Sequence, residues 1–450
     1  MMCILLDFIY LLFLVLSSPF WLYRMLAQGR YRTGWKQRLG FVPVRHSRQP
    51  CIWIHAVSVG EVNAIAALVK KLKTVLPQFE IVISSTTDTG IARARNTYEK
   101  SHRVFFFPFD FSLAQKRAFQ RLHPQLCILM ELEVWHNFTA LAQKLHIPVV
   151  VANGRISAAK GFPRYRKIAS LVRPMFRRLS LVLAQDDEYA QRFQFLGVPA
   201  DRVQVVGSLK YDTAPTDPDT IPFDDSIAKL KFRQTDLIWV AGSTGPGEET
   251  LILDSFEKLR NIDTLENLRL VIVPRKPERF DEVARWIESR GHKLLRYSRV
   301  KCGPYLTAEA DEQAVILGDT MGDLQKFYKV AAVIFVGRSL VPMGGSDMME
   351  AAALAKPVVV GPYTENFTET VNALVARRGI EVVADGNQLS DCIEKLLTDK
   401  KTAQNLARNA RNVILDHQGA TQRTVEAILS LLGFQLPYSD HAIATPSIKT

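Results

Sequence analysis

Short apolar runs alternate with amphipathic stretches along most of this chain, and this alternation constrains the fold more than any other feature. The runs have the length and composition of β-strands, and the stretches between them have the apolar spacing of helices. Repeated strand–helix units require parallel strands covered by helices on both faces of a sheet. The sequence therefore predicts an α/β fold of the doubly wound type.

The alternation occurs in two blocks. The expected strands of the first block are Cys51–Val57, Glu80–Ser84, Arg103–Phe107, Leu126–Met130, Pro148–Ala152 and Leu181–Ala184, and those of the second are Leu237–Ala241, Leu268–Val273, Ala314–Leu317, Ala332–Phe335, Pro357–Val360 and Glu381–Ala384. A segment rich in proline and acidic residues, 212–225, separates the blocks and is typical of an interdomain linker. We therefore predict a membrane anchor at 1–23, a first domain at 24–212, a linker at 213–234, a second domain at 235–432 and a flexible tail at 433–450.

Two doubly wound domains in one chain belong to a small set of architectures. Two-domain glycosyltransferases, some epimerases and periplasmic-type binding proteins share it. In each case the ligand is expected outside the carboxyl ends of the strands. The predicted fold class is therefore two Rossmann-like domains that face a central cleft, preceded by an N-terminal helix.

The first 23 residues are almost entirely apolar, and Asp7 is their only charged residue. About 20 such residues suffice for a helix to cross a bilayer. A basic flank follows, comprising Arg24, Arg30, Arg32, Lys36 and Arg38. By the positive-inside rule this flank stays in the cytoplasm, which places the N-terminus outside and the bulk of the chain inside. A cleaved signal peptide would carry its charges before the apolar run. A buried helix of a soluble domain and an interfacial helix are the alternatives to a membrane span.

The net charge of +12 indicates acidic partners, such as anionic lipid or phosphorylated substrates. Nucleic acid is not favoured, because the basic residues are spread over both halves without an aromatic-interleaved patch. The five cysteines lie far apart, which indicates reduced thiols in a cytoplasmic setting. No spacing typical of a metal site occurs among the histidines, cysteines and carboxylates, so neither a metal nor a cofactor is predicted.

A carboxylate follows the first strand of the first block, within Ser58-Val59-Gly60-Glu61. Glu61 falls in the first turn of the next helix, where it could accept a proton from a substrate hydroxyl. The alternative is that Ser58 and Glu61 only cap that helix.

Polar side chains also follow two later strands of this block. Glu131, Glu133 and Trp135 come directly after one strand and could form a sugar-binding rim, or they could be solvated and packed residues. Arg155 follows the next strand and could meet a phosphate or carboxylate, or pair with one of these glutamates.

In the second block, small or charged residues follow four successive strands. These segments are Gly242–Glu249, Pro274–Arg279, Gly318–Leu324 and Gly344–Ala351. Free N–H groups at helix N-termini suit phosphate, and a first-turn glutamate suits ribose hydroxyls. None of the segments is a Walker loop or a nicotinamide-binding fingerprint. Together they predict a nucleotide site.

In their order along the chain, these motifs resemble those of the 3-deoxy-D-manno-octulosonic acid (Kdo) transferases of lipopolysaccharide synthesis. The likeness extends to about Leu432 and also includes Ser85–Gly90, Asn153–Ser157 and Gly207–Asp212. The resemblance implies CMP-Kdo as donor and the lipid A precursor (lipid IVA) as acceptor, with inversion and without metal. It implies Glu61 as general base and places Lys210, Ser243, Thr244, Arg275, Ser346, Asp347 and Glu350 at the donor.

The expected acceptor residues are Glu131, Glu133, Trp135 and Arg155, and the anionic inner-membrane surface is the expected partner of the anchor. The chain departs from the family pattern, which usually has His at position 245 and Pro at 136, and His-Asn-Pro-Leu at 346–349. A related transferase that uses another nucleotide sugar, and a nucleotide-binding pseudoenzyme, are therefore the alternative functions.

Overall fold

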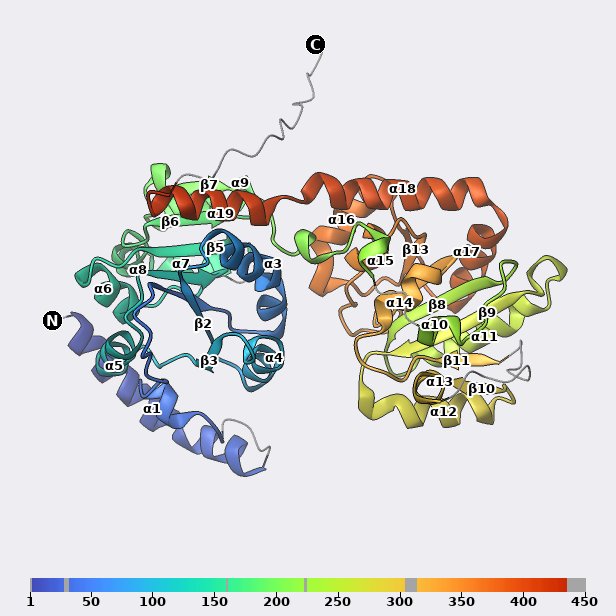
Figure 1. Ribbon diagram of the computed structural model, residues 1–450, viewed down its shortest axis with the longest axis horizontal. Helices are drawn as coiled ribbons and strands as arrows, with labels where there is room; N and C mark the ends of the chain where they lie inside the picture. The colour runs from blue at the N-terminus through green and yellow to red at the C-terminus, as the bar shows by residue number, and fades with distance from the viewer. Residues whose placement is uncertain (1, 28–31, 159–160, 222–224, 304–313, 435–450) are drawn as a thin grey trace, which may run out of the picture. The chain divides into compact units, whose positions relative to one another are not determined.

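The computed structural model describes residues 2–27, 32–158, 161–221, 225–303 and 314–434. The chain folds into two compact units (Figure 1). The first unit comprises Met1–Thr213 with Gln418–Thr450, and the second comprises Ala214–His417. Arg30 of the basic flank and most of the predicted tail, from residue 435 on, lie outside the described residues.

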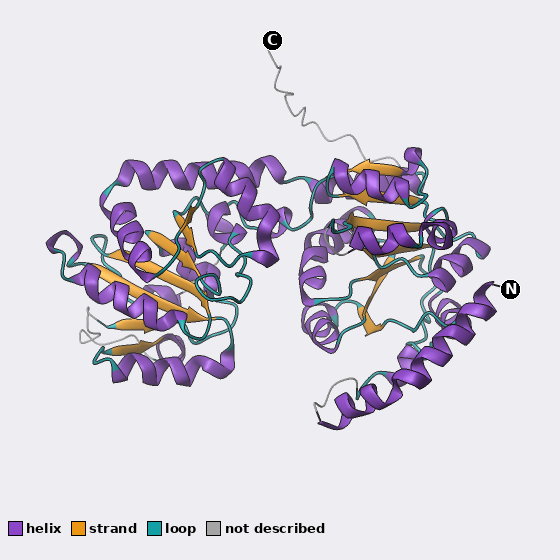
Figure 2. Cartoon of the chain, turned by 180° about the vertical axis from the view of Figure 1, so that it is seen from behind, coloured by secondary structure: helices purple, strands orange, loops and turns teal. Residues whose placement is uncertain are grey.

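The first unit contains a sheet of seven parallel strands in the order β3-β2-β1-β4-β5-β6-β7. Helices lie against this sheet (Figure 2). Its strands are β1 (Cys51–His55), β2 (Glu80–Ser85), β3 (Arg103–Phe106), β4 (Leu126–Met130), β5 (Val149–Gly154), β6 (Leu181–Ala184) and β7 (Val203–Val205). Its helices are α1 (Met2–Ala27), α2 (Trp35–Arg38), α3 (Val59–Val75), α4 (Asp88–Tyr98), α5 (Ser112–Leu122), α6 (His136–Lys144), α7 (Gly161–Lys167), α8 (Ala169–Phe176), α9 (Asp187–Phe195) and α19 (Ala420–Leu431).

The central strands of this sheet are buried on both faces, as a parallel sheet requires. Alternate residues of β1 show why. Ile52 and Ile54 pack in one apolar core with α3, α4 and α19, whereas Trp53 packs in the opposite core with α5, α6, α8 and α9. The apolar runs are therefore continuous along the strands and do not alternate with polar residues.

The second unit contains a second sheet of seven parallel strands, in the order β10-β11-β9-β8-β12-β13-β14. Its strands are β8 (Leu237–Thr244), β9 (Leu268–Pro274), β10 (Leu294–Arg296), β11 (Val315–Leu317), β12 (Val333–Val336), β13 (Val358–Val360) and β14 (Glu381–Val382). Its helices are α10 (Asp225–Ala228), α11 (Glu248–Arg260), α12 (Phe280–Ser289), α13 (Tyr297–Cys302), α14 (Leu324–Val330), α15 (Met349–Ala353), α16 (Thr368–Ala376), α17 (Gly386–Thr398) and α18 (Lys400–His417). The prediction of two doubly wound α/β domains with an apolar N-terminal helix is confirmed.

The sequence division placed residues 235–432 in one domain, and here the structure differs. Helix α19 packs against α3 in the first unit, where Val425 and Ile428 join the core of the first sheet (Figure 1). The carboxylate of Asp212 accepts a hydrogen bond of 2.7 Å from the Gly419 N–H and so fixes the start of α19. An amphipathic helix can cover either sheet, so its periodicity alone does not assign it to a domain.

Helix α1 includes the stretch Leu5–Ala27, which is long and apolar enough to cross a membrane by length and composition. Its apolar side chains are largely exposed. The structure thus shows a helix that could anchor the chain to a membrane.

Candidate active site

The strand order of the first sheet reverses direction between β1 and β4, because β1 pairs with β2 on one side and with β4 on the other. Such a switch point leaves a crevice at the carboxyl ends of the two strands, where doubly wound proteins bind ligands. Glu61 follows β1, while Glu131 and Glu133 follow β4. The three carboxylates that the sequence singled out therefore come from the two strands flanking this point.

The carboxylate of Glu61 is nine-tenths buried and is held from two sides. One of its oxygens accepts a hydrogen bond of 2.9 Å from the Val57 N–H, and the other accepts one of 2.9 Å from the Ser58 hydroxyl. The Ser58 hydroxyl in turn accepts from the Glu61 N–H, as in a capping box. Ser58 and Glu61 thus do cap the helix. Each carboxylate oxygen nevertheless keeps a lone pair that can accept one more hydrogen bond.

Burial raises the pKa of Glu61 to about 7. The hydrogen bonds from Val57 and Ser58 oppose this shift, whereas the charges of Glu131 and Glu133 add to it. A group with a pKa near neutrality can both take up and release a proton at physiological pH, which is the property that a general base needs.

Two residues at this edge of the first sheet hold a left-handed backbone conformation that few residues other than glycine adopt. Glu131 has φ 53° and Asn153, at the end of β5, has φ 55°. The Asn153 side chain accepts a hydrogen bond of 3.0 Å from the Leu209 N–H, which holds the loop before Lys210. Local strain of this kind tends to concentrate at functional sites.

The remaining predicted residues of the first unit contact one another or their neighbours at the same edge. The Lys210 ammonium lies 4.0 Å from a Glu131 oxygen. The Trp135 indole donates a hydrogen bond of 3.1 Å to Glu133, whose pKa is raised mainly by burial. Arg155 donates a hydrogen bond of 3.2 Å to the Tyr189 hydroxyl. Lys210, which the resemblance places at the donor, thus lies beside Glu131, which was predicted to bind the acceptor.

The second sheet has its own switch point, between β8 and β12. Ser243 in β8 has φ 58°, and Arg338, just after β12, has φ 60°. The Ser346 hydroxyl donates to the Ser243 carbonyl at 3.4 Å, so the loop before α15 lies against the end of β8. The predicted phosphate loop and the Gly344–Glu350 turn are therefore neighbours at one edge of this sheet.

A residue that the sequence interpretation missed, Glu248, organises this edge. Its carboxylate is fully buried and accepts hydrogen bonds from four backbone N–H groups. They belong to Gly245 (2.8 Å), Arg338, Ser339 (2.8 Å) and Leu340 (2.9 Å). Glu248 therefore joins the loop after β8 to the loop after β12. The only sequence signal was an acidic residue in the first turn of a helix, which is common.

The neighbouring Glu249 holds the other side of the phosphate loop. It accepts a hydrogen bond of 2.8 Å from the Thr244 hydroxyl and forms an ion pair with Arg279 at 2.6 Å. The Thr244 hydroxyl already donates its hydrogen bond to Glu249. The backbone of Thr244 is therefore more available than its side chain for contact with a nucleotide sugar.

The acidic end of the Gly344–Glu350 turn is partly buried. Burial raises the pKa of Glu350, the nearby Asp347 raises it further, and Arg275 acts in the opposite direction. Tyr328 is fully buried beside them, and burial and the same two carboxylates raise the pKa of its hydroxyl. In the described part of the chain this hydroxyl has no hydrogen-bond partner. Arg275 is therefore close enough to Glu350 and Tyr328 to lower the pKa of both groups.

The departures from the family pattern have local structural explanations. A Cβ atom at position 245 would lie 2.7 Å from the Met343 sulfur. Met343 therefore occupies space that a larger residue, such as the usual histidine, would need at this position. His136 is the first residue of α6, a position that accepts proline equally well. Asp347 accepts a hydrogen bond of 2.8 Å from the Met349 N–H, as an asparagine there could.

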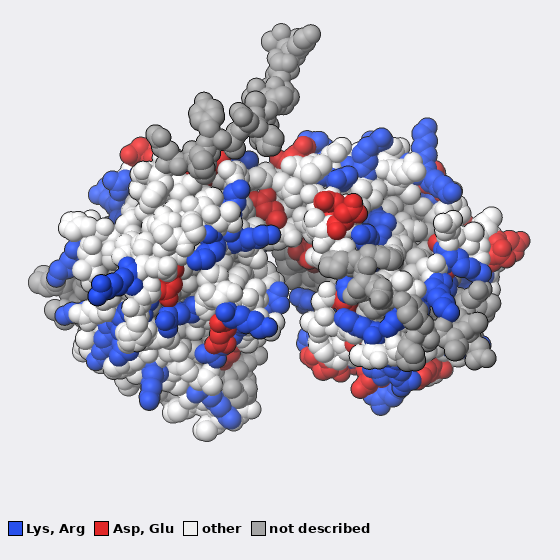
Figure 3. All heavy atoms as spheres, in the orientation of Figure 1, with Lys and Arg blue, Asp and Glu red and all other residues white. Residues whose placement is uncertain are grey.

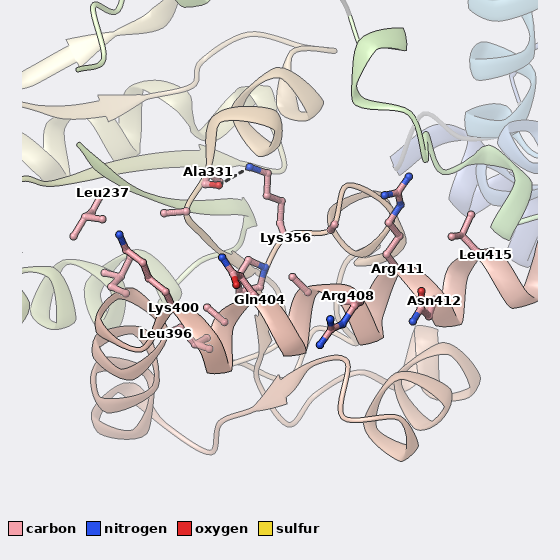
Figure 4. Close-up of a pocket in the computed structure, with 16 residues that line it drawn as sticks. Leu237, Ala331, Lys356, Leu396, Lys400, Gln404, Arg408, Arg411, Asn412 and Leu415 are labelled. Atoms are coloured by element: carbon pink, nitrogen blue, oxygen red, sulfur yellow. Dashed lines mark hydrogen bonds between the residues drawn. The ribbon is translucent and has the colours of Figure 1, made fainter. Parts of the chain in front are cut away.

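One groove of the second unit lies away from these residues. It has a volume of about 560 Å³ and runs beside α18, at the amino ends of β8, β12 and β13 (Figure 4). Four cations line it, namely Lys356, Lys400, Arg408 and Arg411. Lys356 donates a hydrogen bond of 2.8 Å to the Ala331 carbonyl, and Arg411 donates one of 3.0 Å to the Thr216 carbonyl. The predicted site residues lie at the carboxyl ends of the strands and do not line this groove.

Within the described ranges, no group of three or more potential metal ligands occurs.

Comparisons with known proteins agree with this division of the chain. Residues 33–213 match the family model of 3-deoxy-D-manno-octulosonic-acid transferase (kdotransferase), and residues 305–413 match that of glycosyl transferases group 1. The chain is 34% identical over 401 residues to the 3-deoxy-D-manno-octulosonic acid transferase of Haemophilus influenzae, covering 89% of this chain and 91% of that protein. It is 30% identical over 394 residues to the Bordetella pertussis protein of the same description, with coverage of 85% and 87%.

Solved structures show the same fold at low sequence identity. A UDP-N-acetylglucosamine 2-epimerase has a TM-score of 0.56 at 15% identity, covering 88% of this chain and all of its own. A glycosyltransferase from Rickettsia africae has a TM-score of 0.54 at 13% identity, covering 86% and 99%.

Proposed function

The chain belongs to the 3-deoxy-D-manno-octulosonic acid (Kdo) transferase family, and from this premise we propose that it transfers Kdo from CMP-Kdo to the lipid A precursor (lipid IVA) in lipopolysaccharide synthesis. The observation that carries the proposal is Glu61, a buried carboxylate with a pKa of about 7 at the switch point of the first sheet. A carboxylate in that state is suited to accept a proton from a sugar hydroxyl.

In the proposed reaction, Glu61 takes the proton of the acceptor's primary hydroxyl as the hydroxyl oxygen attacks the anomeric carbon of Kdo. The new carbon–oxygen bond forms as the bond from that carbon to the CMP phosphate breaks, with inversion. CMP leaves with the bonding electron pair, and no metal takes part. The rim formed by Glu131, Glu133, Trp135 and Arg155 binds the acceptor.

The second unit holds the donor in this proposal. Arg275 and the backbone N–H groups near Ser243, Thr244 and Ser346 stabilise the phosphate charge that develops as CMP leaves. Glu350 accepts hydrogen bonds from the ribose hydroxyls. Asp347 caps the turn that presents Glu350. Lys210 contributes a further positive charge from the first unit.

We also propose that α1 anchors the protein to the bacterial inner membrane, with both units on the cytoplasmic side. The first unit carries 31 Lys and Arg against 15 Asp and Glu, whereas the second carries 26 against 30. The excess of basic side chains is visible on the first unit (Figure 3). Near a membrane surface each such cation contributes about 1 kcal/mol of attraction to anionic lipid.

The test is transfer by the purified, detergent-solubilised protein with CMP-Kdo generated in place, lipid IVA as acceptor and EDTA present. The expected result is a mass gain of one or more Kdo units on the acceptor. A folded protein that binds CMP but adds no Kdo would contradict the proposed substrates and favour another donor or acceptor. A folded protein that binds no CMP would contradict the proposed donor site.

The pH dependence of kcat/KM provides a second test. Because Glu61 must be ionised to act as a base, we expect activity to rise with pH through an acid limb with an apparent pKa near 7. The charge of Glu131 helps to raise this pKa, so Glu131→Gln should move the limb to lower pH. Initial rates from pH 5 to 9 would measure both. If the apparent pKa of the acid limb were the same in Glu61→Asp and Glu131→Gln as in the wild type, a group other than Glu61 would be titrating.

A further inference from the structure

Helix α1 turns its polar side chains to its less exposed side and its apolar side chains outward. The less exposed positions follow the helical repeat and comprise Cys3, Leu6, Asp7, Tyr10, Ser17, Ser18, Trp21, Arg24 and Met25. They include both charged residues and both serines of the helix. The exposed positions are apolar or aromatic, namely Leu5, Phe8, Ile9, Leu11, Leu12, Phe13, Leu14, Val15, Leu16, Pro19, Phe20, Leu22, Tyr23, Leu26 and Ala27. This pattern is the reverse of that of a helix on a water-exposed surface.

The N-terminal end of α1 is bound to the first unit by a polar contact. One oxygen of Asp7 accepts hydrogen bonds of 2.9 Å from the Ser112 N–H and of 2.9 Å from the Asn137 amide, and the other accepts from the Ser112 hydroxyl. Asp110 caps α6 by accepting from the N–H groups of Asn137 (3.0 Å) and Phe138 (2.8 Å). The single acidic residue of the apolar stretch is therefore hydrogen-bonded to the starts of α5 and α6. Helix α1 lies beside α5 (Figure 1).

Among the described residues that follow α1, Arg32 contacts the helix and Arg38 contacts the first unit. Arg32 donates hydrogen bonds to the carbonyls of Met25 (2.6 Å) and Leu26 (3.0 Å), which cap the helix. Arg38 in α2 is buried, donates a hydrogen bond of 2.9 Å to the Thr86 carbonyl and lies over the Phe106 ring. Asp7 near the start of α1 and Arg38 after its end are thus both bound to the first unit.

We propose that α1 lies in the plane of the membrane, within a single leaflet of an anionic bilayer, and that Asp7 holds it there against α5 and α6. A span would have to place Asp7 on the far side of the membrane and would break its contacts with Ser112 and Asn137. The Tyr10 hydroxyl also donates a hydrogen bond of 3.4 Å to Asp110, so a span that kept these contacts could begin only after Tyr10. The 17 residues beyond Tyr10 extend about 26 Å, which is short of the roughly 30 Å hydrocarbon core of a bilayer. In the plane, the outward apolar side chains enter the leaflet while Asp7 stays on its protein partners.

The charge around the contact fits an anionic lipid surface. Cys3 lies at a small pocket of about 280 Å³ between α1, α5 and α6 that Lys116 and Lys144 also line, together with the exposed Leu113. The unit that carries α1 also holds the whole excess of positive charge. This inference rests on the proposed membrane location, but it concerns the path of α1 and not the reaction.

Cysteine cross-linking in inner-membrane vesicles tests the proposal. Cys302→Ser and Cys392→Ser remove the thiols that are not fully buried, apart from Cys3, and leave the buried Cys51 and Cys127. In this background, Lys116→Cys or Lys144→Cys should cross-link to the native Cys3 through a short bis-maleimide. Lys71→Cys, an exposed position on α3, is the matched control and should not cross-link. Asp7→Ala should reduce the cross-linked fraction several-fold.

Cross-links at both pocket positions would place the N-terminus of α1 on the same side of the membrane as the first unit. Membrane-bound, CMP-binding protein without either cross-link would overturn the proposal and favour a span. A second experiment measures binding of the full chain to phosphatidylglycerol-containing vesicles. The double variant Phe13→Asp, Leu16→Asp should be released from these vesicles. Full retention of that variant on the vesicles would contradict lipid as the cover of the apolar face. None of these results depends on Kdo transfer, so they fail or succeed independently of the proposed reaction.

Discussion

Glu61→Gln is expected to lower kcat by about 10² to 10⁴-fold, because it removes the proposed general base while keeping the size of the side chain. The carbonyl oxygen of the substituted amide can still accept from the Val57 N–H or the Ser58 hydroxyl, so the start of α3 should persist. CMP binding to the second unit should be unchanged. Single-turnover transfer and calorimetric titration with CMP would measure the two quantities separately.

Stability distinguishes this effect from misfolding. The folded-state pKa of Glu61 lies at about 7, above its ordinary value of 4.5, so the folded protein favours the neutral carboxyl. The wild type therefore loses stability relative to Glu61→Gln as pH rises from about 4.5 to about 7, by on the order of 3 kcal/mol in the limit. Glu61→Gln should be the more stable protein at about pH 8, and the difference should vanish below about pH 4.5.

The same exchange at Glu99, an exposed residue directly after α4, is the control. Glu99→Gln should change neither turnover nor stability appreciably, since the side chain of Glu99 is exposed and forms a 3.9 Å ion pair with Arg95. Ordinary turnover in Glu61→Gln would rule out the proposed base. Inactivity together with a loss of stability above neutral pH would indicate that Glu61 acts mainly as a structural cap.

Glu248→Ala should destabilise the second unit by roughly 3–5 kcal/mol, because it leaves four buried N–H groups from two loops without their acceptor. Such a loss is a large part of the roughly 5–15 kcal/mol that keeps a typical domain folded. The loops after β8 and β12 should separate, and CMP affinity should fall with stability. Denaturant unfolding and CMP titration would measure both effects.

Glu278→Ala is the matched control in the same unit, because Glu278 is exposed and forms a 3.8 Å pair with the exposed Lys276. It should change the free energy of unfolding by less than about 1 kcal/mol. Glu248→Gln should fall between the two, since its carbonyl oxygen can still accept two of the four bonds. Wild-type stability and CMP binding in Glu248→Ala would show that the two loops do not depend on this carboxylate.

The sequence by itself determined the fold class. The apolar runs of strands such as β1 and β4 are continuous, and only a parallel sheet buried on both faces accommodates them. The positions of Glu61, Glu131 and Glu133 at strand exits were predictable for the same reason, because carboxyl ends of parallel strands share one edge. The family also followed from the sequence, since its motifs are local and occur in order.

Tertiary structure alone decided the rest. Whether α19 covers the first or the second sheet depends on which core its apolar face fits, and its periodicity is the same in either case. The role of Glu248 depends on N–H groups about 90 residues further along the chain. The raised pKa of Glu61 depends on burial by residues distant in sequence. The partners of Asp7 are likewise more than 100 residues away, so a sequence pattern could identify an apolar helix with one acid but could not show what that acid contacts.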